Sequence, residues 1–321
     1  MVQLFLIGIG AGAATALLFA SVASGSPLSV LLFYLAPLPI LIAALGWSHW
    51  AALIAAMVAS ASLATIFGSF LFIAFLIGIG LPAWCLGYLA LLARPTGAAT
   101  PEGLEWYPVG HLVFWAAVLS ALVVIAAMLS FGTDEASFRA SLRSGLERMF
   151  KVSGDAMSRL PNARNHDRLI DLLVAALPMA ASVLTTVTNI VNLGLAARIV
   201  MVSGRLRRPW PELSAMRFPS YAPVIAGVAV AGALLLPGMP GIASGVLMAS
   251  TLMVYAILGF AVLHTITRGI ATRPFVLGGV YAAVIVFFWP ALALTLLGLA
   301  DAAFDIRGRV AGKRGPPAPG T

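Results

Sequence analysis

The chain has 321 residues, of which 61% are hydrophobic and only 9% are charged. Soluble domains carry about a quarter charged residues, so the composition excludes a soluble globular protein. The apolar runs are continuous rather than alternating, which excludes a membrane β-barrel. The net charge of +8 is concentrated in loops and indicates contact with anionic lipid. Nucleic acid is not an expected partner, because no basic, aromatic-rich module is present.

Long apolar stretches fill most of the chain, and they predict an all-α, polytopic transmembrane helical bundle with about eight or nine spans. A helix needs roughly 20 apolar residues to cross the hydrocarbon core. The predicted spans are Val2–Ser24, Leu28–Gly46, Trp50–Phe67, Phe70–Ala93, Val109–Phe131, Leu169–Val200, Ala222–Leu236, Ile242–Thr267 and Phe275–Ala300. Residues 1–300 are expected to form one transmembrane domain. Residues 301–321 are expected to be a basic, proline-rich, disordered tail.

The first two apolar stretches each carry an ambiguity. Ser21-Val22-Ala23 resembles a signal-peptide cleavage site, but no Lys or Arg precedes the apolar run, so an uncleaved first span is favoured. In the second stretch, Tyr34, Pro37 and Pro39 predict a broken helix. Irregular backbone at membrane depth is tolerated mainly beside a cavity or inside protein.

An insert over residues 132–168 has a helical amphipathic pattern. Its apolar positions are Phe138, Leu142, Leu146, Met149, Phe150 and Met157, and its charged face holds Arg139, Arg143, Glu147, Arg148 and Lys151. The pattern predicts one amphipathic helix lying in the headgroup layer of the membrane. A helix docked on the protein's own loops fits the pattern equally well.

Basic loops should orient the chain, but nine spans place them on both sides of the membrane. The loop after Arg198 and the turn with Arg268 and Arg273 would then lie on one side of the membrane. The insert and the tail would lie on the other side, and both sets are basic. Either one apolar stretch does not cross, with the short Ala222–Leu236 the best candidate, or one basic loop is exported. We expect the loop to be cytoplasmic and to contact partners or lipid. The residues expected to do so are Arg205, Arg207, Arg208 and Trp210.

The sixth predicted span carries the strongest polar signal of the chain. Thr185, Thr188, Asn189 and Asn192 fall at i, i+3, i+4 and i+7, on one face of one helix. Such groups are costly against lipid, so they must face protein, water or ligand. The pattern favours interhelical hydrogen bonding, with a ligand-binding face as the close alternative, so these four residues are candidate ligand contacts. His264, on the eighth span, is expected to add a smaller polar end.

Motifs of enzymes are missing from this sequence. It contains no GxxxxGK[ST], HExxH, GxSxG or CxxC motif, and its four histidines are scattered. We therefore expect no enzymatic activity, no catalytic residue, no metal and no cofactor. Gly8 and Gly12 are four residues apart, which is typical of a helix-packing face rather than a nucleotide loop. Cys85 is the only cysteine, so an intrachain disulfide is impossible.

Several features in order resemble the YybS-like bacterial membrane proteins, a family of unknown function. They are the glycine-rich first span, Leu35-Ala36-Pro37-Leu38-Pro39, the loop from Arg205 to Pro211, and Gly298-x-x-Asp301-x-x-x-Asp305-x-Arg307. That family is thought to be distantly similar to the substrate-capture (S) components of energy-coupling-factor transporters. The resemblance implies a multi-pass protein of the bacterial inner (cytoplasmic) membrane that binds a small molecule and relies on separate ATPase subunits. S components are shorter, six-helix proteins, and none of their ligand-contacting motifs can be placed here.

The sequence therefore favours an integral inner-membrane protein that binds or transports a small solute through the face around Asn189 and Asn192. The alternative is a non-enzymatic scaffold or assembly factor. It would recruit partner proteins through its basic loops.

Overall fold

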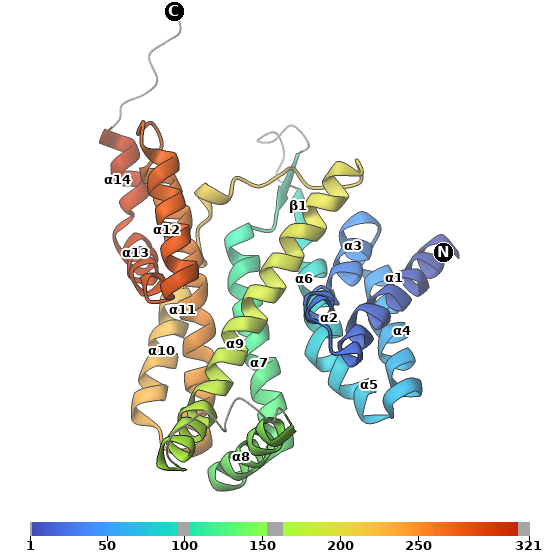
Figure 1. Cartoon of the computed structure of the whole chain (residues 1–321). Helices are drawn as coiled ribbons and strands as arrows, with labels where there is room; N and C mark the ends of the chain where they lie inside the picture. Colours follow the sequence, from blue (N-terminus) through green and yellow to red (C-terminus); the bar gives the residue numbers. More distant parts are fainter. Residues whose placement is uncertain (1, 96–102, 153–162, 314–321) are drawn as a thin grey trace, which may run out of the picture.

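The computed structural model describes residues 2–95, 103–152 and 163–313, and it confirms an all-α polytopic bundle (Figure 1). Its helices are α1 (Val2–Ala20), α2 (Pro27–Tyr34), α3 (Leu38–Gly46), α4 (His49–Phe67), α5 (Phe70–Phe75), α6 (Leu81–Ala90), α7 (Val109–Phe131), α8 (Glu135–Val152), α9 (Ala163–Val202), α10 (Ala222–Leu235), α11 (Gly238–Ile266), α12 (Arg273–Phe287), α13 (Pro290–Phe304) and α14 (Ile306–Lys313). Seven helical segments of the described part are long and apolar enough to cross a membrane.

Small residues set the packing of the first helix. A Cβ atom added at Gly8 would lie 2.6 Å from the Ile54 side chain, and one at Gly12 would lie 2.7 Å from the Ala55 carbonyl. Helices α1 and α4 therefore run parallel and in close contact, which confirms the predicted glycine packing face. The expected break in the second span is also present, since α2 ends at Tyr34 and α3 begins at Leu38.

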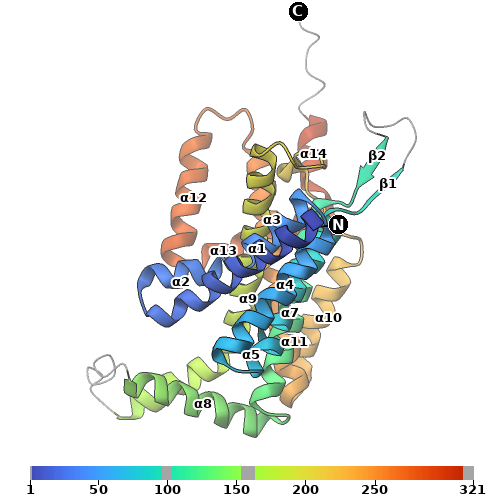
Figure 2. The same cartoon turned by 90° about the vertical axis from the view of Figure 1, so that its right-hand side faces the viewer.

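The amphipathic insert forms α8, and its apolar face packs on the protein itself. Phe138 and Leu142 are buried in one cluster with Ile170 and Val174 of α9. Figure 2 shows α8 lying across one end of the bundle rather than along it. The position of α8 fits a helix in the headgroup layer of a membrane, and its contacts are those of a helix docked on the protein. Both predicted arrangements of the insert are therefore compatible with the structure. Of the predicted face, the side chains of Phe150 and Lys151, and all of Met157, lie outside the described residues.

The ninth predicted span, Phe275–Ala300, is wrong as a single crossing. The helix breaks at Phe288, whose φ of 57° is left-handed, and restarts at Pro290. Helices α12 and α13 have 15 residues each. Each is therefore about 22 Å long, which is too short for a hydrocarbon core of about 30 Å.

Both ends of the α12–α13 unit meet the same loop. Arg268, before α12, forms an ion pair with Glu212, and Arg307, after α13, donates a hydrogen bond to the Ser214 carbonyl. The unit therefore enters and leaves the bundle at one end, as a re-entrant hairpin. The sequence had favoured Ala222–Leu236 as the stretch that does not cross; α10 has only 14 residues and is not among the seven candidate spans, but it does lead from one end of the bundle to the other. Helix α10 connects that loop to Gly238, which lies near Glu135 at the opposite end.

The tail also differs from its prediction. Residues 301–304 complete α13, and residues 306–313 form α14, because the buried Asp301 binds Arg307 and fixes the start of the final helix. The remainder of the expected disordered tail lies outside the described residues. Helix α14, the 205–217 loop and the turn at Arg268 share one end of the bundle, called here the basic end (Figure 1). Helix α8 lies at the opposite end, so the conflict between the basic loops is largely removed.

Candidate functional site

The asparagine stripe is buried and hydrogen-bonded to neighbouring helices. The Asn189 side-chain amide donates to Ser120 Oγ of α7 at 3.0 Å. The Asn192 amide donates to the Tyr34 carbonyl at 2.8 Å, where the second span breaks, and also to the Thr188 carbonyl. Thr185 and Thr188 are half-buried. The amide donors thus already have protein partners, although Asn192 Oδ1 is buried without one in the described part of the chain.

A long connection at the basic end covers the centre of the bundle. It comprises residues 205–217, called here the strap, and it follows Gly204, whose φ of 67° favours glycine. Arg208 donates hydrogen bonds to the carbonyls of Ala90 (3.2 Å) and Tyr107 (3.1 Å). Burial lowers the pKa of Arg208, because desolvation disfavours its charge. These bonds hold the strap over the bundle.

Aromatic stacking and a second set of bonds fix the rest of the strap. The Arg205 guanidinium lies 4.7 Å from the Trp47 ring centre, and that of Arg198 lies 5.6 Å from the Trp210 ring centre. At exposed arginines such as these, each cation–π contact contributes about 0.5–1 kcal/mol. Arg307 bonds the Ser214 carbonyl near the other end of the strap at 2.8 Å. The strap is therefore attached along most of its length.

Beneath the strap lies the larger of two neighbouring cavities, with a volume of about 760 Å³. Helices α7, α9, α11 and α12 contribute its remaining walls. Its apolar lining consists of Val113, Ile190, Trp210, Pro211, Leu213, Met216, Ile257, Phe260 and Ala261. Its polar lining consists of Glu212, Ser214, His264, Arg268, Arg273 and Tyr281.

The second cavity has a volume of about 430 Å³ and lies on the other side of the same wall. The residues that line both cavities are Val113, Ile190, Trp210, Pro211 and Leu213. Both volumes fall in the range of roughly 300–1,000 Å³ that is typical of small-molecule sites. The walls of the smaller cavity are apolar except for Arg198 and Arg208, and both of those side chains already contact the protein.

Polar groups gather where α11 ends and α12 begins. His264 Nε2 and the Tyr281 hydroxyl are 2.9 Å apart, and the Tyr281 ring stacks on Phe260. Arg268 forms a 2.7 Å ion pair with Glu212. Two hydrogen bonds lower the pKa of Glu212: the larger effect comes from the Arg268 guanidinium and the smaller one from the Ser214 hydroxyl. The larger cavity is thus apolar in its body and polar at one end.

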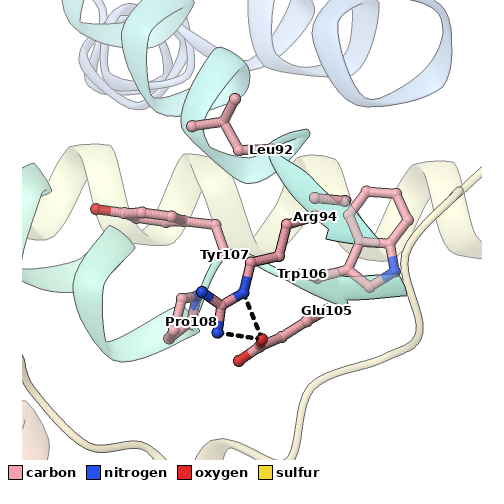
Figure 3. Close-up of a pocket in the computed structure, with 7 residues that line it drawn as sticks. Leu92, Arg94, Glu105, Trp106, Tyr107 and Pro108 are labelled. Atoms are coloured by element: carbon pink, nitrogen blue, oxygen red, sulfur yellow. Dashed lines mark hydrogen bonds and ion pairs between the residues drawn. The ribbon is translucent and has the colours of Figure 1, made fainter. Parts of the chain in front are cut away.

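A third hollow lies at the hairpin of β1 (Ala93–Pro95) and β2 (Leu104–Trp106), which the sequence did not predict. Figure 3 shows the Arg94 guanidinium turned toward Glu105 on the paired strand, and the two form a 2.6 Å ion pair. Their side chains are 77% and 48% exposed. An exposed pair of this kind contributes about 0–1 kcal/mol, and both charges are already matched, so this hollow is the weaker candidate.

The structure brings together residues that the sequence had placed in separate groups. His264 lines the larger cavity, Arg208 lines the smaller one, and Trp210 lines both. The two asparagines lie on the same helix as Ile190, but their amides bond elsewhere. Sequence reasoning missed Arg273 and Tyr281, because α12 had been read as part of one long span. No cluster of three metal-binding side chains occurs among the described residues.

Comparison with known families gives one match. A family model described as "Predicted membrane protein (DUF2232)" matches residues 13–302, which is nearly the whole chain. The chain belongs to this family. No curated protein and no solved structure matches it. Family membership agrees with a multi-pass membrane protein, and the description of the family specifies no activity.

Proposed function

We propose that this DUF2232 protein binds a small, largely apolar molecule in the two adjoining cavities beneath the strap. The observation that carries the proposal is the shared wall of Val113, Ile190, Trp210, Pro211 and Leu213, which separates two largely apolar cavities beneath the strap. Ligand sites are concave, mostly apolar, and supplied with a few polar groups that fix orientation. The polar end near His264 fits that description.

The proposed binding site differs from the predicted one: it lies in the cavities beside Ile190 of α9 and not at the asparagine amides. The proposed class of function, binding of a small molecule, is the same. Asn189 and Asn192 support the cavity walls by holding α9 against α7 and against the break between α2 and α3. Solute capture of the S-component type, with separate ATPase subunits in a bacterial inner membrane, is the form of transport that the YybS resemblance implies. This form of the proposal involves no enzymatic step.

Filling the shared wall tests the proposal. Ile190 lines both cavities, and its neighbour Val191 is 48% exposed on the outer face of the same helix. In nanodiscs, the fluorescent apolar probe N-phenylnaphthylamine should bind the wild-type protein and Val191→Trp alike. Binding to Ile190→Trp should be about tenfold weaker, because the indole occupies the site. If both variants bind the probe equally well, or if the wild type does not bind it, the proposal fails.

A scaffold that recruits partner proteins is the second candidate. Arg207 is exposed on the strap, beside the exposed Arg205. Substituting Arg207 with glutamine should release co-purifying proteins from the membrane complex while probe binding persists. Unchanged co-purification would reject the scaffold role without affecting the cavity proposal.

A further inference from the structure

The polar end of the larger cavity has an uneven charge balance. Its charged lining residues are two arginines, Arg268 and Arg273, and one carboxylate, Glu212. Arg268 forms its ion pair with Glu212, and their side chains are 49% and 63% exposed. Arg273 has no acidic partner among the described residues that line this cavity. One positive charge at the polar end is therefore unmatched.

Arg273 also has a hydrogen-bond donor that the protein does not use. Its Nε is buried and has no acceptor in the described part of the chain. A buried, unpaired donor on a charged group is costly, whereas a charge-assisted bond to a phosphate or carboxylate is about twice as strong as a neutral one. The position thus favours an anionic acceptor over a neutral or cationic one.

Neighbouring groups could share the recognition of such an acceptor. The Tyr281 hydroxyl lies 2.9 Å from His264 Nε2, and both residues line the same end of the cavity as Arg273. Tyr281 is 42% exposed, so this end is reachable from outside the protein. Phe260 and Ile257 continue the wall from the polar end toward the apolar body.

Resting on the function proposed above, we infer that the ligand is an anionic amphiphile. Its single phosphate or carboxylate group would bind at Arg273, and its apolar chain would lie against Phe260, Ile257 and Ile190. The same chemistry is offered by a lipid of the bilayer and by a free solute with an apolar tail. A cation of equal chain length would be repelled by Arg273.

Three probes with the same ten-carbon chain test the inference: decyl phosphate, decanol and decyltrimethylammonium. They are titrated against the full chain in phosphatidylcholine nanodiscs, with Trp fluorescence as the readout because Trp210 lines the cavity. Decyl phosphate should bind about tenfold more tightly than decanol, and the cation most weakly. Arg273→Gln should reduce the preference for the anion to about threefold or less while decanol still binds. Arg309→Gln, at an exposed position of α14, is the matched control and should preserve the preference.

The outcomes separate this inference from the function on which it rests. Equal binding of the three probes would overturn anion recognition and leave the cavity function standing. Binding of none of them would count against both. If Arg273→Gln does not fold, the wild-type order of affinities still decides the question.

Two further arms identify the source of the anion. Phosphatidic acid included in the nanodisc should compete with decyl phosphate if the natural ligand is a lipid, whereas added decanoate should compete if it is a soluble solute. Competition by neither compound would contradict recognition of an anionic amphiphile. Competition by inorganic phosphate alone would show that the apolar chain is not recognised, which overturns the inference.

Discussion

The side-chain amide of Asn192 donates a 2.8 Å hydrogen bond to the main-chain carbonyl of Tyr34, 158 positions earlier in the chain. Helix α2 ends at Tyr34, and the next N–H that could serve this carbonyl, that of Leu38, donates to Leu35 instead. Pro37 has no N–H to offer. The broken second span thus obtains a hydrogen-bond donor from α9.

Replacing Asn192 with leucine should destabilise the fold. The Tyr34 carbonyl would lose this partner in a region poor in water, and leaving a buried group unsatisfied costs about 1–3 kcal/mol. Reversible unfolding in mixed micelles should therefore show a lower free energy of unfolding for Asn192→Leu. Val191→Leu, on the exposed side of the same turn, should stay within about 0.5 kcal/mol of the wild type. An Asn192→Leu protein as stable as wild type would refute this role.

The ion pair between Asp301 and Arg307 should be among the costliest to break. Arg307 Nη2 lies 2.8 Å from Asp301 Oδ2, and the two side chains are 8% and 3% exposed. Removing one partner of a buried pair costs about 3–5 kcal/mol, because the other charge is left uncompensated. Asp301→Asn should lower the free energy of unfolding by that amount. It should also speed proteolysis of the strap, which Arg307 holds at Ser214.

A second ion pair nearby provides the control. Asp305 pairs with Arg217 at 2.9 Å, but the Arg217 and Asp305 side chains are 67% and 53% exposed. Asp305→Asn should change the free energy of unfolding by about 1 kcal/mol or less, since exposed pairs are screened by water. Equal effects of the two substitutions would show that burial of the Asp301 pair does not decide its strength.

Acid should loosen the strap through Glu212. The Arg268 hydrogen bond lowers the pKa of Glu212 below its ordinary value of 4.5. A group with a lowered folded-state pKa contributes stability in full above the unfolded value, and that contribution is lost as pH falls through the folded value. The fluorescence of Trp210 should therefore shift as the pH falls below 4.5. Glu212→Gln should lack this shift; a wild-type signal that stays constant over this range would contradict the prediction.

The re-entrant α12–α13 hairpin predicts which residues share one side of the membrane. In a Cys85→Ala background, single cysteines replacing Ser203 and Arg309 should react with an impermeant maleimide from the same side. A cysteine replacing Ser144 of α8 should react from the opposite side. We expect the Ser203 side to be cytoplasmic, because the strap arginines adjoin span ends there. Labelling of positions 203 and 309 from opposite sides would show that α12–α13 crosses the bilayer.

Much of the architecture follows from the apolar pattern alone. A run of about 20 apolar residues has only one stable form in lipid, a helix that bonds its own backbone, so the long spans were predictable. The Gly8 and Gly12 contact and the break before Pro37 also follow from local chemistry, because small residues permit close approach and proline lacks an N–H. These features depend on neighbours in the sequence.

The candidate site depended on contacts that no local pattern encodes. The helical periodicity placed Asn189 and Asn192 on one face, but whether Ser120, Tyr34 or a ligand meets that face is decided by which helices pack there. Arg273 appeared as a loop charge, because Phe275–Ala300 is apolar enough to be read as one crossing. Only the fold, by turning the chain back between α11 and α12, sets Arg273 and Tyr281 beside His264 under the strap. Hydropathy indicates that a segment is removed from water, but it does not indicate which segment packs against it. The spans could therefore be predicted from the sequence, whereas the cavity is decided by tertiary packing.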